Sequence, residues 1–539
     1  MKHYYKGILF FAFVTSTLLM SAQPAIEWGE RYNAPPDMAD ESTDLAVDAA
    51  GNVYVTGSGF NSGGNIDIIT VKYDANGNQV WVRNYDRGIG GNDQGSAIAL
   101  DPAGNVYVCG FSMSTSNSGD ACVVKYDNGG TQQWASFYNG QYNQMDEARA
   151  ISVNAAGDVF ICGYTSDSLY MFNTLTVCYN TGGTQQWAQV YDGPVNGNDE
   201  LRDIVIDASS NVYVTGNREV TSSDWESLTI KYNSAGSQQW LMTYAGTGGS
   251  DYGKAITLDN NGNVLVGCQS FMTNNWFDYV TIKYSNAGVQ QWASRYNHGN
   301  NRFEDVWDIV TDNAGYVYVT GQSQATGNNS APPDATTVKY TPGGNQVWVQ
   351  RYDGGFTEDD RAYAIALDDT ANVYVAGYSK NASNADFITI KYDSAGTQEY
   401  VLRYNSQYNL AEQINSLAVQ NGNIYVTGWS SNPTNNDYFT IKYSYATVGV
   451  QENNPLTSSL TAFPVPASDL LNVNTGTAAG ENSTLTIQDM SGRTVLVTTL
   501  RTGAVTHQVN IAALAEGTYT LSYRDAGGSL LASRLFFKN

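Results

Sequence analysis

The sequence predicts an all-β protein in which an eight-bladed β-propeller is followed by a small β-sandwich of immunoglobulin-like type. A motif recurs eight times, at intervals of 51 to 56 residues: an acidic residue, a short apolar strand, a D-x-x-G-N turn and V-Y-V-T-G or a close variant. Each copy contains only short strand patterns separated by turns. A period of this size built from strands is typical of propeller blades. The period stops near residue 443, where a different alternating pattern begins.

Residues 1–22 are predicted to form an export signal. A positively charged start is followed by a mostly apolar run over residues 8–20, and the small residues Ser21 and Ala22 precede the expected cleavage site. The apolar run is shorter than the roughly 20 residues that a membrane-spanning helix needs. Because no later segment is apolar enough to cross a membrane, we expect an exported protein without a membrane span.

Each copy of the repeat is interpreted as four strands. In the second copy these are residues 97–101, 106–109, 121–126 and 133–138, joined by tight turns in which Gly adopts positive φ. The D-x-x-G-N segments, such as residues 259–263, lack the alternating ligands and the trailing Glu of a calcium-binding loop, so we interpret them as hairpin turns. The Trp near the start of the fourth strand is expected to pack between blades.

The two ends of the repeat array complement each other. A lone strand over residues 26–32 carries Trp28 where the other copies carry their fourth-strand Trp, and the last copy ends after its third strand at Tyr443. We therefore predict that residues 26–32 complete the eighth blade, which removes an exposed sheet edge. The propeller is expected to span residues 23–443 and to be a monomer.

The D-x-x-G-N-V-Y-V-T-G and K-Y-D-x-x-G-x-x-x-W segments resemble the SBBP family of propeller repeats, over about 420 residues. The resemblance implies the propeller fold and says little about function, because such repeats are generic scaffolds. That family is usually described as seven-bladed, whereas the eight copies in this chain predict eight blades.

The C-terminal part has a different pattern. Residues 444–459 are interpreted as a linker, and residues 460–539 as a second domain of short alternating strands. Three segments resemble the type A C-terminal sorting domain of the type IX secretion system: F-P-V-P-A-S-D-L-L-N-V at residues 463–473, I-Q-D-M-S-G-R-T-V at residues 487–495 and L-A-E-G-T-Y-T-L at residues 514–521. The family usually has Asn where Val465 stands. The resemblance implies export by the type IX secretion machinery to the outer-membrane surface or the medium. A carbohydrate-binding or adhesive sandwich is the alternative, which the absence of Trp disfavours.

Charge and cysteine content limit the partners. The chain has 27 Lys and Arg against 51 Asp and Glu, a net charge of −24. This balance argues against nucleic acid and anionic membranes as ligands, while it permits cationic partners and divalent metals. Five Cys leave at least one thiol without an intramolecular partner; Cys109 and Cys122 fall on neighbouring strands of the second copy and could approach each other, and semi-buried strand residues are the alternative for all five. No Cys or His spacing suits a zinc site.

Two sets of polar residues, mostly carboxylates, recur in the copies. One precedes the end of the first strand by eight residues: Asp40, Asp93, Asp146, Asp199, Asp251, Glu304, Asp360 and Glu412. The other precedes the third-strand Tyr by six residues: Asp67, Asp120, Asn173, Glu226, Asp278, Asp334, Asp386 and Asp437. Both sets are expected in loops of one face, where they could bind Ca²⁺ through oxygen ligands. In the alternative interpretation, each Asp accepts backbone N–H groups of its own loop. Two carboxylates about 8 Å apart in water repel by only about 0.5 kcal/mol, so a metal is not required.

Aromatic residues in the variable loops between the second and third strands are the candidate ligand-binding residues: Phe111, Tyr164, Trp225, Trp276, Phe277 and Trp429. Aromatic side chains on a polar rim suit a glycan or protein ligand, and core packing is the alternative for each of them.

Motifs for catalysis are scarce. The chain has three His and neither G-x-S-x-G nor H-E-x-x-H. Its G-x-x-x-W segments resemble eight-bladed quinoprotein dehydrogenases, but the adjacent Cys pair of that family is absent. We therefore predict a non-catalytic binding or adhesion propeller with no firmly implied cofactor. The alternative is an extracellular polysaccharide hydrolase or lyase that uses carboxylates of the loop-bearing face.

Overall fold

The computed structural model describes residues 23–538, except residues 89, 115–117, 273–275, 300–302, 325–330, 356–357, 446–459, 464–468, 476–477, 490–492, 516 and 528–529. The predicted signal at residues 1–22 and most of the predicted linker therefore lie outside the described residues. The chain divides into two compact units, residues 1–445 and residues 446–539, and each is described by itself. Within the described residues, no helix has the length and apolar character that a membrane span requires.

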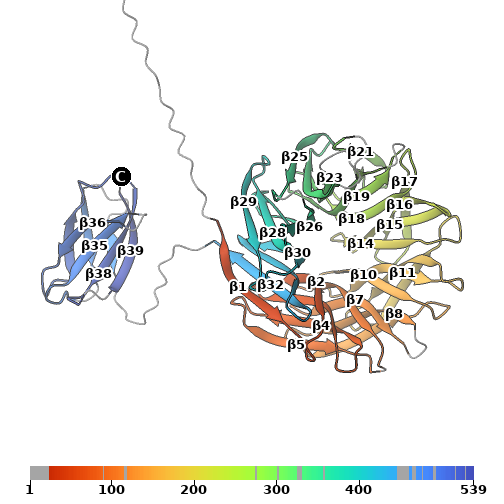
Figure 1. The fold of residues 1–539 in the computed structure, drawn as a ribbon, viewed down its shortest axis with the longest axis horizontal. Coiled ribbons are helices and arrows are strands. Elements are labelled where there is room, and N and C mark those ends of the chain that lie inside the picture. The colour runs from red at the N-terminus through yellow and green to blue at the C-terminus, as the bar shows by residue number, and fades with distance from the viewer. Residues whose placement is uncertain are drawn as a thin grey trace, which may run out of the picture. The chain divides into compact units, whose positions relative to one another are not determined.

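The first unit is an eight-bladed propeller, as predicted. Eight four-stranded antiparallel sheets stand around a central axis (Figure 1). The innermost strands are β2 (Asp40–Val47), β6 (Asp93–Leu100), β10 (Asp146–Val153), β14 (Glu200–Ile206), β18 (Asp251–Leu258), β22 (Glu304–Thr311), β26 (Asp360–Leu367) and β30 (Glu412–Gln420). The second strands are β3 (Val53–Phe60), β7 (Val106–Met113), β11 (Val159–Ser166), β15 (Val212–Thr221), β19 (Val264–Phe271), β23 (Val317–Gln324), β27 (Val373–Lys380) and β31 (Asn423–Ser431).

The third strands are β4 (Ile66–Tyr73), β8 (Gly119–Tyr126), β12 (Phe172–Tyr179), β16 (Asp224–Tyr232), β20 (Phe277–Tyr284), β24 (Pro333–Tyr340), β28 (Ala385–Tyr392) and β32 (Asn436–Ser444). The outer strands are β5 (Gln79–Tyr85), β9 (Gln132–Tyr138), β13 (Gln185–Tyr191), β17 (Gln238–Tyr244), β21 (Gln290–Tyr296), β25 (Gln346–Tyr352), β29 (Gln398–Tyr404) and β1 (Ala25–Tyr32). We number the blades 1 to 8 by their innermost strands, from β2 to β30.

Strand β1 closes the ring. It pairs with β32 as the outer strand of blade 8, and Trp28 lies opposite Lys442. This confirms the predicted closure. The hydrophobic cores lie between neighbouring blades: Val53 and Val55 of blade 1 pack in one cluster with Tyr425 and Tyr438 of blade 8. The pairing of β1 with β32 therefore completes the sheet of blade 8 and accompanies a hydrophobic core between blades 8 and 1.

The repeated Trp joins each blade to the next. The indole N–H of Trp81 donates to the backbone O of Asn128, 3.0 Å away in the β8–β9 turn, and the ring lies against Gly130 of that turn. Blade 7 carries Tyr400 in place of Trp, and its hydroxyl lies 2.9 Å from that of Tyr445. Blade 8 has no third-to-fourth-strand turn, because the chain leaves β32 instead of turning back. Tyr400, which replaces the repeated Trp in blade 7, therefore lies where the next blade lacks the turn that the Trp contacts elsewhere.

The D-x-x-G-N segments form hairpin turns, as interpreted from the sequence. Asp48 accepts backbone N–H groups from Ala50 and Asn52, each at 2.9 Å. Gly51 has a φ of 82°. Ser210 and Ala371 occupy the equivalent place in two other turns and adopt φ of 59° and 60°, a conformation that costs a residue with a Cβ atom about 1–2 kcal/mol.

The innermost strands differ from the sequence prediction. Strand β6 begins at Asp93 rather than at the expected Ala97. The first carboxylate set therefore lies at the start of the innermost strands, or one residue earlier for Asp199, and not in the loops. The predicted strand was too short because a β-bulge interrupts its alternation, between Gly95 and Ala97 in β6 and at the same place in the other seven innermost strands.

The five Cys are all free and buried. Cys109 pairs in register with Val123, and Cys122 with Gly110. This one-residue offset puts the two thiols on opposite faces of the sheet, so the neighbouring strands do not bring them into a disulfide.

The second unit contains two antiparallel sheets. One consists of β33 (Thr461–Phe463), β34 (Leu470–Asn474) and β37 (Thr506–Asn510), and the other of β36 (Thr494–Thr499), β35 (Thr484–Asp489), β38 (Gly517–Arg524) and β39 (Leu530–Lys538). Leu471 and Val509 from one sheet and Ile487 and Leu521 from the other belong to a single buried core. Two sheets on one core agree with a sandwich, and the immunoglobulin-like topology stays a prediction.

Candidate functional site

The carboxylates of the first set are buried at one face of the propeller. We call this face the loop face, because it carries the connections between second and third strands and between blades. None of the eight is more than 1% exposed. Each accepts the backbone N–H of a residue five or six positions earlier, at 2.5 to 3.4 Å; Asp146, for example, accepts from Gly140 at 2.7 Å. The hydrogen bonds thus follow the backbone-acceptor interpretation.

Burial raises the pKa of these carboxylates. It raises the pKa of Asp146 to about 6 and that of Asp40 to about 7, against backbone hydrogen bonds that lower it. The pKa of Glu304 is raised to about 8, first by burial and then by the nearby charge of Asp278. A carboxyl group with such a pKa is largely protonated in mildly acidic solution.

The second carboxylate set is neutralised by arginines. In blade 8, Arg31 donates to Asp437 at 2.7 Å and to the hydroxyl of Ser430 at 2.6 Å. Four further pairs join residues of one blade: Arg218–Glu226, Arg295–Asp278, Arg351–Asp334 and Arg403–Asp386. The remaining pair, Arg87–Asp120, uses an arginine from the loop that precedes its blade.

Blades 1 and 3 depart from this pattern. Blade 3 has Asn173, which needs no counter-charge. Blade 1 has Asp67, and the ion pairs of the described residues include none for it. Asp67, Asp86 and Asp93 bring three carboxylate oxygens within 4.8 Å of one another. A similar group, Asp334, Asp353 and Asp360, includes the partner of Arg351. The predicted Ca²⁺ binding can be tested at these two groups, because each brings carboxylates close together.

The predicted ligand-binding aromatics lie in different surroundings. Trp225 and Phe277 are half-buried, and each ring centroid lies 6.0 Å from that of Tyr252 on β18. Tyr164 is only 5% exposed and donates its hydroxyl to Glu147 at 2.9 Å. These three residues lie near the innermost strands of blades 3 to 5.

The other three predicted aromatics do not join them. Phe111 and Trp429 are half-buried on the second strands of blades 2 and 8. Trp276 is half-buried just before β20, where its carbonyl accepts the backbone N–H of Met272 at 2.9 Å. The structure therefore distributes the six residues along the loop face rather than in one site.

The structure reveals a set of unlike side chains that sequence reasoning missed. The bulge of each innermost strand projects one extra residue, and these residues differ from blade to blade: Thr43, Ser96, Arg149, Arg202, Lys254, Trp307, Tyr363 and Asn415. Blades 8, 1 and 2 supply small or amide side chains, whereas blades 3 to 7 supply charged and aromatic ones. The signal in the sequence was this variation at a position where the surrounding residues repeat.

We define the axial cluster as Arg149, Glu200, Arg202, Lys254, Asp305, Trp307, Arg361 and Tyr363, all on innermost strands. Contacts link it across blades. Arg149 donates to Glu200 at 2.6 Å, and Arg202 also binds Glu200. Lys254 lies 3.2 Å from Asp305 and 5.5 Å from the centroid of Trp307.

Aromatic contacts extend the axial cluster into blade 7. The rings of Trp307 and Tyr363 meet edge to face at 5.0 Å, and Tyr363 lies 6.0 Å from Tyr378. The guanidinium of Arg361 lies 5.8 Å from the Tyr378 ring. Trp307 remains 38% exposed. The cluster thus combines a solvent-accessible indole with cations, carboxylates and phenols.

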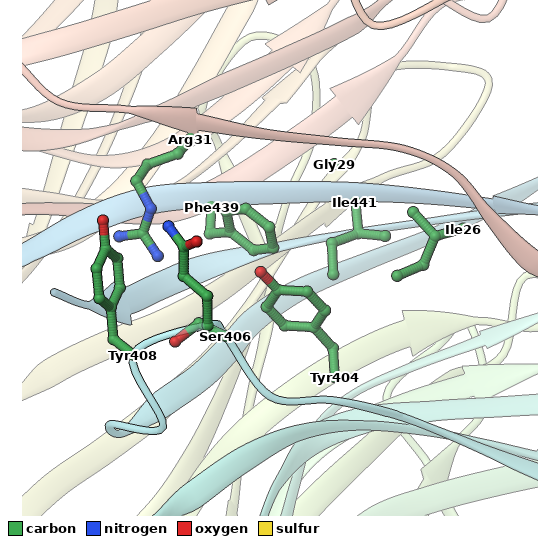
Figure 2. A pocket seen from close by; sticks show the side chains of 9 residues that line it. Ile26, Gly29, Arg31, Tyr404, Ser406, Tyr408, Phe439 and Ile441 are labelled. Atoms are coloured by element: carbon green, nitrogen blue, oxygen red, sulfur yellow. The ribbon is translucent and has the colours of Figure 1, made fainter.

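Two pockets add to the candidate sites. One, of about 240 Å³, lies between blades 1 and 2 and is lined by Glu41, Thr43, Phe60 and Gln94 among others. A second, of about 470 Å³, lies at the closure between blades 7 and 8, lined by Ile26, Gly29, Arg31, Tyr404, Ser406, Gln407, Tyr408, Phe439 and Ile441 (Figure 2). Tyr404 stacks on Phe439 with centroids 4.7 Å apart. Because Arg31 is already bound to Asp437 and Ser430, this pocket offers few free polar groups.

Comparison with known proteins identifies the C-terminal unit. Residues 461–535 match the family described as secretion system C-terminal sorting domain. This match agrees with the sequence resemblance and indicates export by type IX secretion to the cell surface or the extracellular space. The propeller lies outside the matched residues. No curated protein is significantly similar to the chain in sequence.

Several solved structures are distantly similar in fold. The polysaccharide lyase Uly1 has a TM-score of 0.42 at 9% identity, covering 67% of this chain and 93% of that one. The periplasmic gluconolactonase PpgL of Pseudomonas aeruginosa has a TM-score of 0.41 at 13% identity, covering 65% and 95%. The β-propeller domain of the Trilobed protease from Pyrococcus furiosus has a TM-score of 0.35 at 9% identity, covering 68% and 95%. Likenesses of this size say nothing about activity.

Proposed function

We propose that this protein is a secreted or cell-surface binding or adhesion propeller without catalytic activity, and that a glycan or protein ligand contacts its loop face at the axial cluster. One observation carries the proposal. The residues that break the eightfold repeat gather on the innermost strands of adjacent blades, where a repeated scaffold has no structural need for unlike side chains.

The chemistry of the axial cluster suits a polar ligand with an apolar face. Trp307 offers an exposed aromatic surface, and an exposed aromatic among polar groups is a feature of recognition sites. Lys254 lies next to this ring, and Arg361 lies two residues before Tyr363, which packs on it, so both supply donors at the cluster. Trp225 and Phe277, which are linked through Tyr252, form a second aromatic group in blades 4 and 5.

A glycan array and a screen for polysaccharide turnover, both with and without Ca²⁺, test the proposal on the exported protein. We expect binding without turnover, and affinity reduced about tenfold or more by Trp307→Ala. Trp225→Ala, Trp276→Ala and Trp429→Ala test the residues singled out from the sequence. Val80→Ala, which shortens an exposed side chain of β5, is the control and should bind as the unchanged protein does.

The alternative is an extracellular polysaccharide hydrolase or lyase. The observation in its favour is that the axial cluster places unlike titratable groups together: burial raises the pKa of Asp305, while Lys254, Arg202 and Arg361 lower it. Turnover that survives Trp307→Ala and is lost on replacing a single loop-face carboxylate would overturn the binding proposal in favour of this alternative.

A further inference from the structure

Each of the four cations of the axial cluster is bound by an acid, and two of these acids are shared between cations. Glu200 is shared by Arg149 and Arg202. Asp359, at the end of the preceding loop, is shared by Arg361 at 3.3 Å and Lys380 at 3.7 Å. With Glu147, which lies 3.4 Å from Arg149, the four cations of the cluster contact four acids. In a chain with a net charge of −24, this local balance of cations and acids is unusual.

Among the residues that the structure describes, two guanidinium donors of this cluster have no acceptor. The Nε atoms of Arg202 and Arg361 are buried and form no hydrogen bond with any of these residues. A buried charged donor without an acceptor costs free energy, so an acceptor group at this place would be favourable. An anionic oxygen suits guanidinium donors best, because such charge-assisted hydrogen bonds are about twice as strong as neutral ones.

The two arginines belong to one contiguous site. Lys254 forms an ion pair with Asp305 at 3.2 Å, and the charges of Arg202 and Arg361 also lower the pKa of this carboxylate, which burial raises. Lys254 contacts both Asp305 and the Trp307 ring. Tyr363, two residues after Arg361, packs edge to face on that indole. The exposed aromatic surface therefore lies beside the cations that act on Asp305.

The opposite sector of the ring lacks this character. In blade 1, Thr43 donates its hydroxyl to the backbone O of Gly95 at 3.1 Å. In blade 8, Asn415 donates to the backbone O of Ser42 at 2.7 Å. These bulge residues are uncharged and hydrogen-bonded to neighbouring strands. The cationic and aromatic groups are thus confined to one side of the axis.

We infer that the axial cluster binds a saccharide that bears an anionic group, a carboxylate or a sulfate, with the sugar ring against Trp307 and the anionic group held by Arg202 and Arg361. This inference rests on the proposed function and specifies its ligand. The net negative charge of the protein repels a polyanion at long range, but at physiological ionic strength that repulsion is screened beyond about 8 Å.

Matched polysaccharide pairs test the inference with the exported protein. Polygalacturonate and its methyl ester share one backbone, as do dextran sulfate and dextran, so the members of each pair differ only at the group that carries the charge. We expect the charged member of at least one pair to bind about tenfold more tightly than its neutral partner. Preference for polygalacturonate assigns the anionic group as a carboxylate, and preference for dextran sulfate assigns it as a sulfate.

Substitutions complete the test. The double variant Arg202→Gln/Arg361→Gln should lose the preference for the charged member, whereas Arg83→Gln, on the outer strand β5, should keep it. Melting curves verify that each variant is folded, and the single variants serve if the double variant is not. Equal binding of charged and neutral members, or an undiminished preference in a folded double variant, would overturn the inference.

Failure of the inference can be told apart from failure of the proposed function. Binding of a neutral glycan or of a protein, weakened by Trp307→Ala, would refute the anionic ligand and leave the binding function standing. If no glycan or protein is bound in any arm, both fail.

Discussion

Arg31 donates a hydrogen bond to Asp437 at 2.7 Å, although the two residues are 406 positions apart in the sequence. Asp437 is only 1% exposed. Removing the guanidinium leaves this buried carboxylate without its counter-charge, so we expect Arg31→Ala to lower the free energy of unfolding by about 2 kcal/mol. Chemical denaturation measures this change in the free energy of unfolding.

The matched control for ring closure is Arg403→Ala, which removes an equivalent ion pair with Asp386 within blade 7. Both variants should lose similar stability, but only Arg31→Ala should speed proteolytic removal of β1. Equal protease sensitivity would show that the Arg31 pair contributes nothing special to closure.

The buried carboxylates predict a stability that falls as the pH rises. The pKa of Asp146 is raised to about 6 and those of Asp40 and Asp308 to about 7, each chiefly by burial. A raised pKa means that the folded state holds its proton more tightly than the unfolded chain, so this contribution is complete below pH 4 and is lost as the pH rises through the folded-state pKa. We expect the melting temperature to fall between pH 5 and pH 8. Asp146→Asn should reduce that slope, and a slope of opposite sign would contradict this account.

The hairpin turn at Ala371 offers a gain in stability. Ala371 adopts a φ of 60° at a place where most other copies have Gly. Ala371→Gly removes the strain of this left-handed conformation, partly offset by the greater chain entropy of Gly, and should stabilise the protein by about 0.5–1 kcal/mol. The reverse change, Gly51→Ala, should destabilise it through φ alone, because a Cβ there meets no atom closer than 3.4 Å. Thermal melts of the two variants should shift in opposite directions.

Substitutions of Asp67 and Asp334 form a matched pair that tests how carboxylate charge affects stability and Ca²⁺ binding. Asp67→Asn removes one of three crowded carboxylates and should raise stability by a few tenths to about 1 kcal/mol. Asp334→Asn removes the partner of Arg351 and should lower it. If the predicted Ca²⁺ binds beside Asp93, added Ca²⁺ should stabilise the unchanged protein and not the Asp67→Asn variant. Calorimetric titration with Ca²⁺ and with EDTA decides between the metal and the backbone-acceptor interpretations.

The sorting domain predicts an export phenotype. Deleting residues 461–535 should trap the propeller in the periplasm, because the matched sorting family directs the later step across the outer membrane. Immunoblots of periplasmic, surface and medium fractions measure this. Undiminished amounts at the surface or in the medium would refute the assignment.

The repeat made the scaffold predictable. Eight copies of one motif and the complementary ends fixed the blade count and the pairing of Trp28 with β32. The exception at Tyr400 needed the structure, because its partner Tyr445 stands where the chain leaves the pattern. The start of each innermost strand was predicted wrongly, because the bulge hides the alternation on which strand prediction depends.

Because the bulges were not predicted, the candidate site built from the bulge residues was missed as well. Recurring carboxylates such as Asp146 attracted attention because they repeat, yet the structure gives them backbone partners. Trp307 and Arg361 occur once each at their positions, Arg202 shares its position only with Arg149, and none of the three matches a motif. Asp203 was also missed, and it accepts the backbone N–H of Ile256 in the next blade at 2.8 Å. In this chain, variation within the repeat is more informative about function than the repeat itself.

The pairing of β1 with β32 sets an order on the making of the protein. Strand β1 leaves the ribosome before every other strand of the propeller, yet its partner is the last strand of the propeller. The ring therefore closes only after residue 444 has been synthesised, and the sorting domain follows directly. A truncated chain that lacks β32 would lack the sorting domain as well. Only a chain that contains every strand of the ring therefore carries the domain that directs it across the outer membrane.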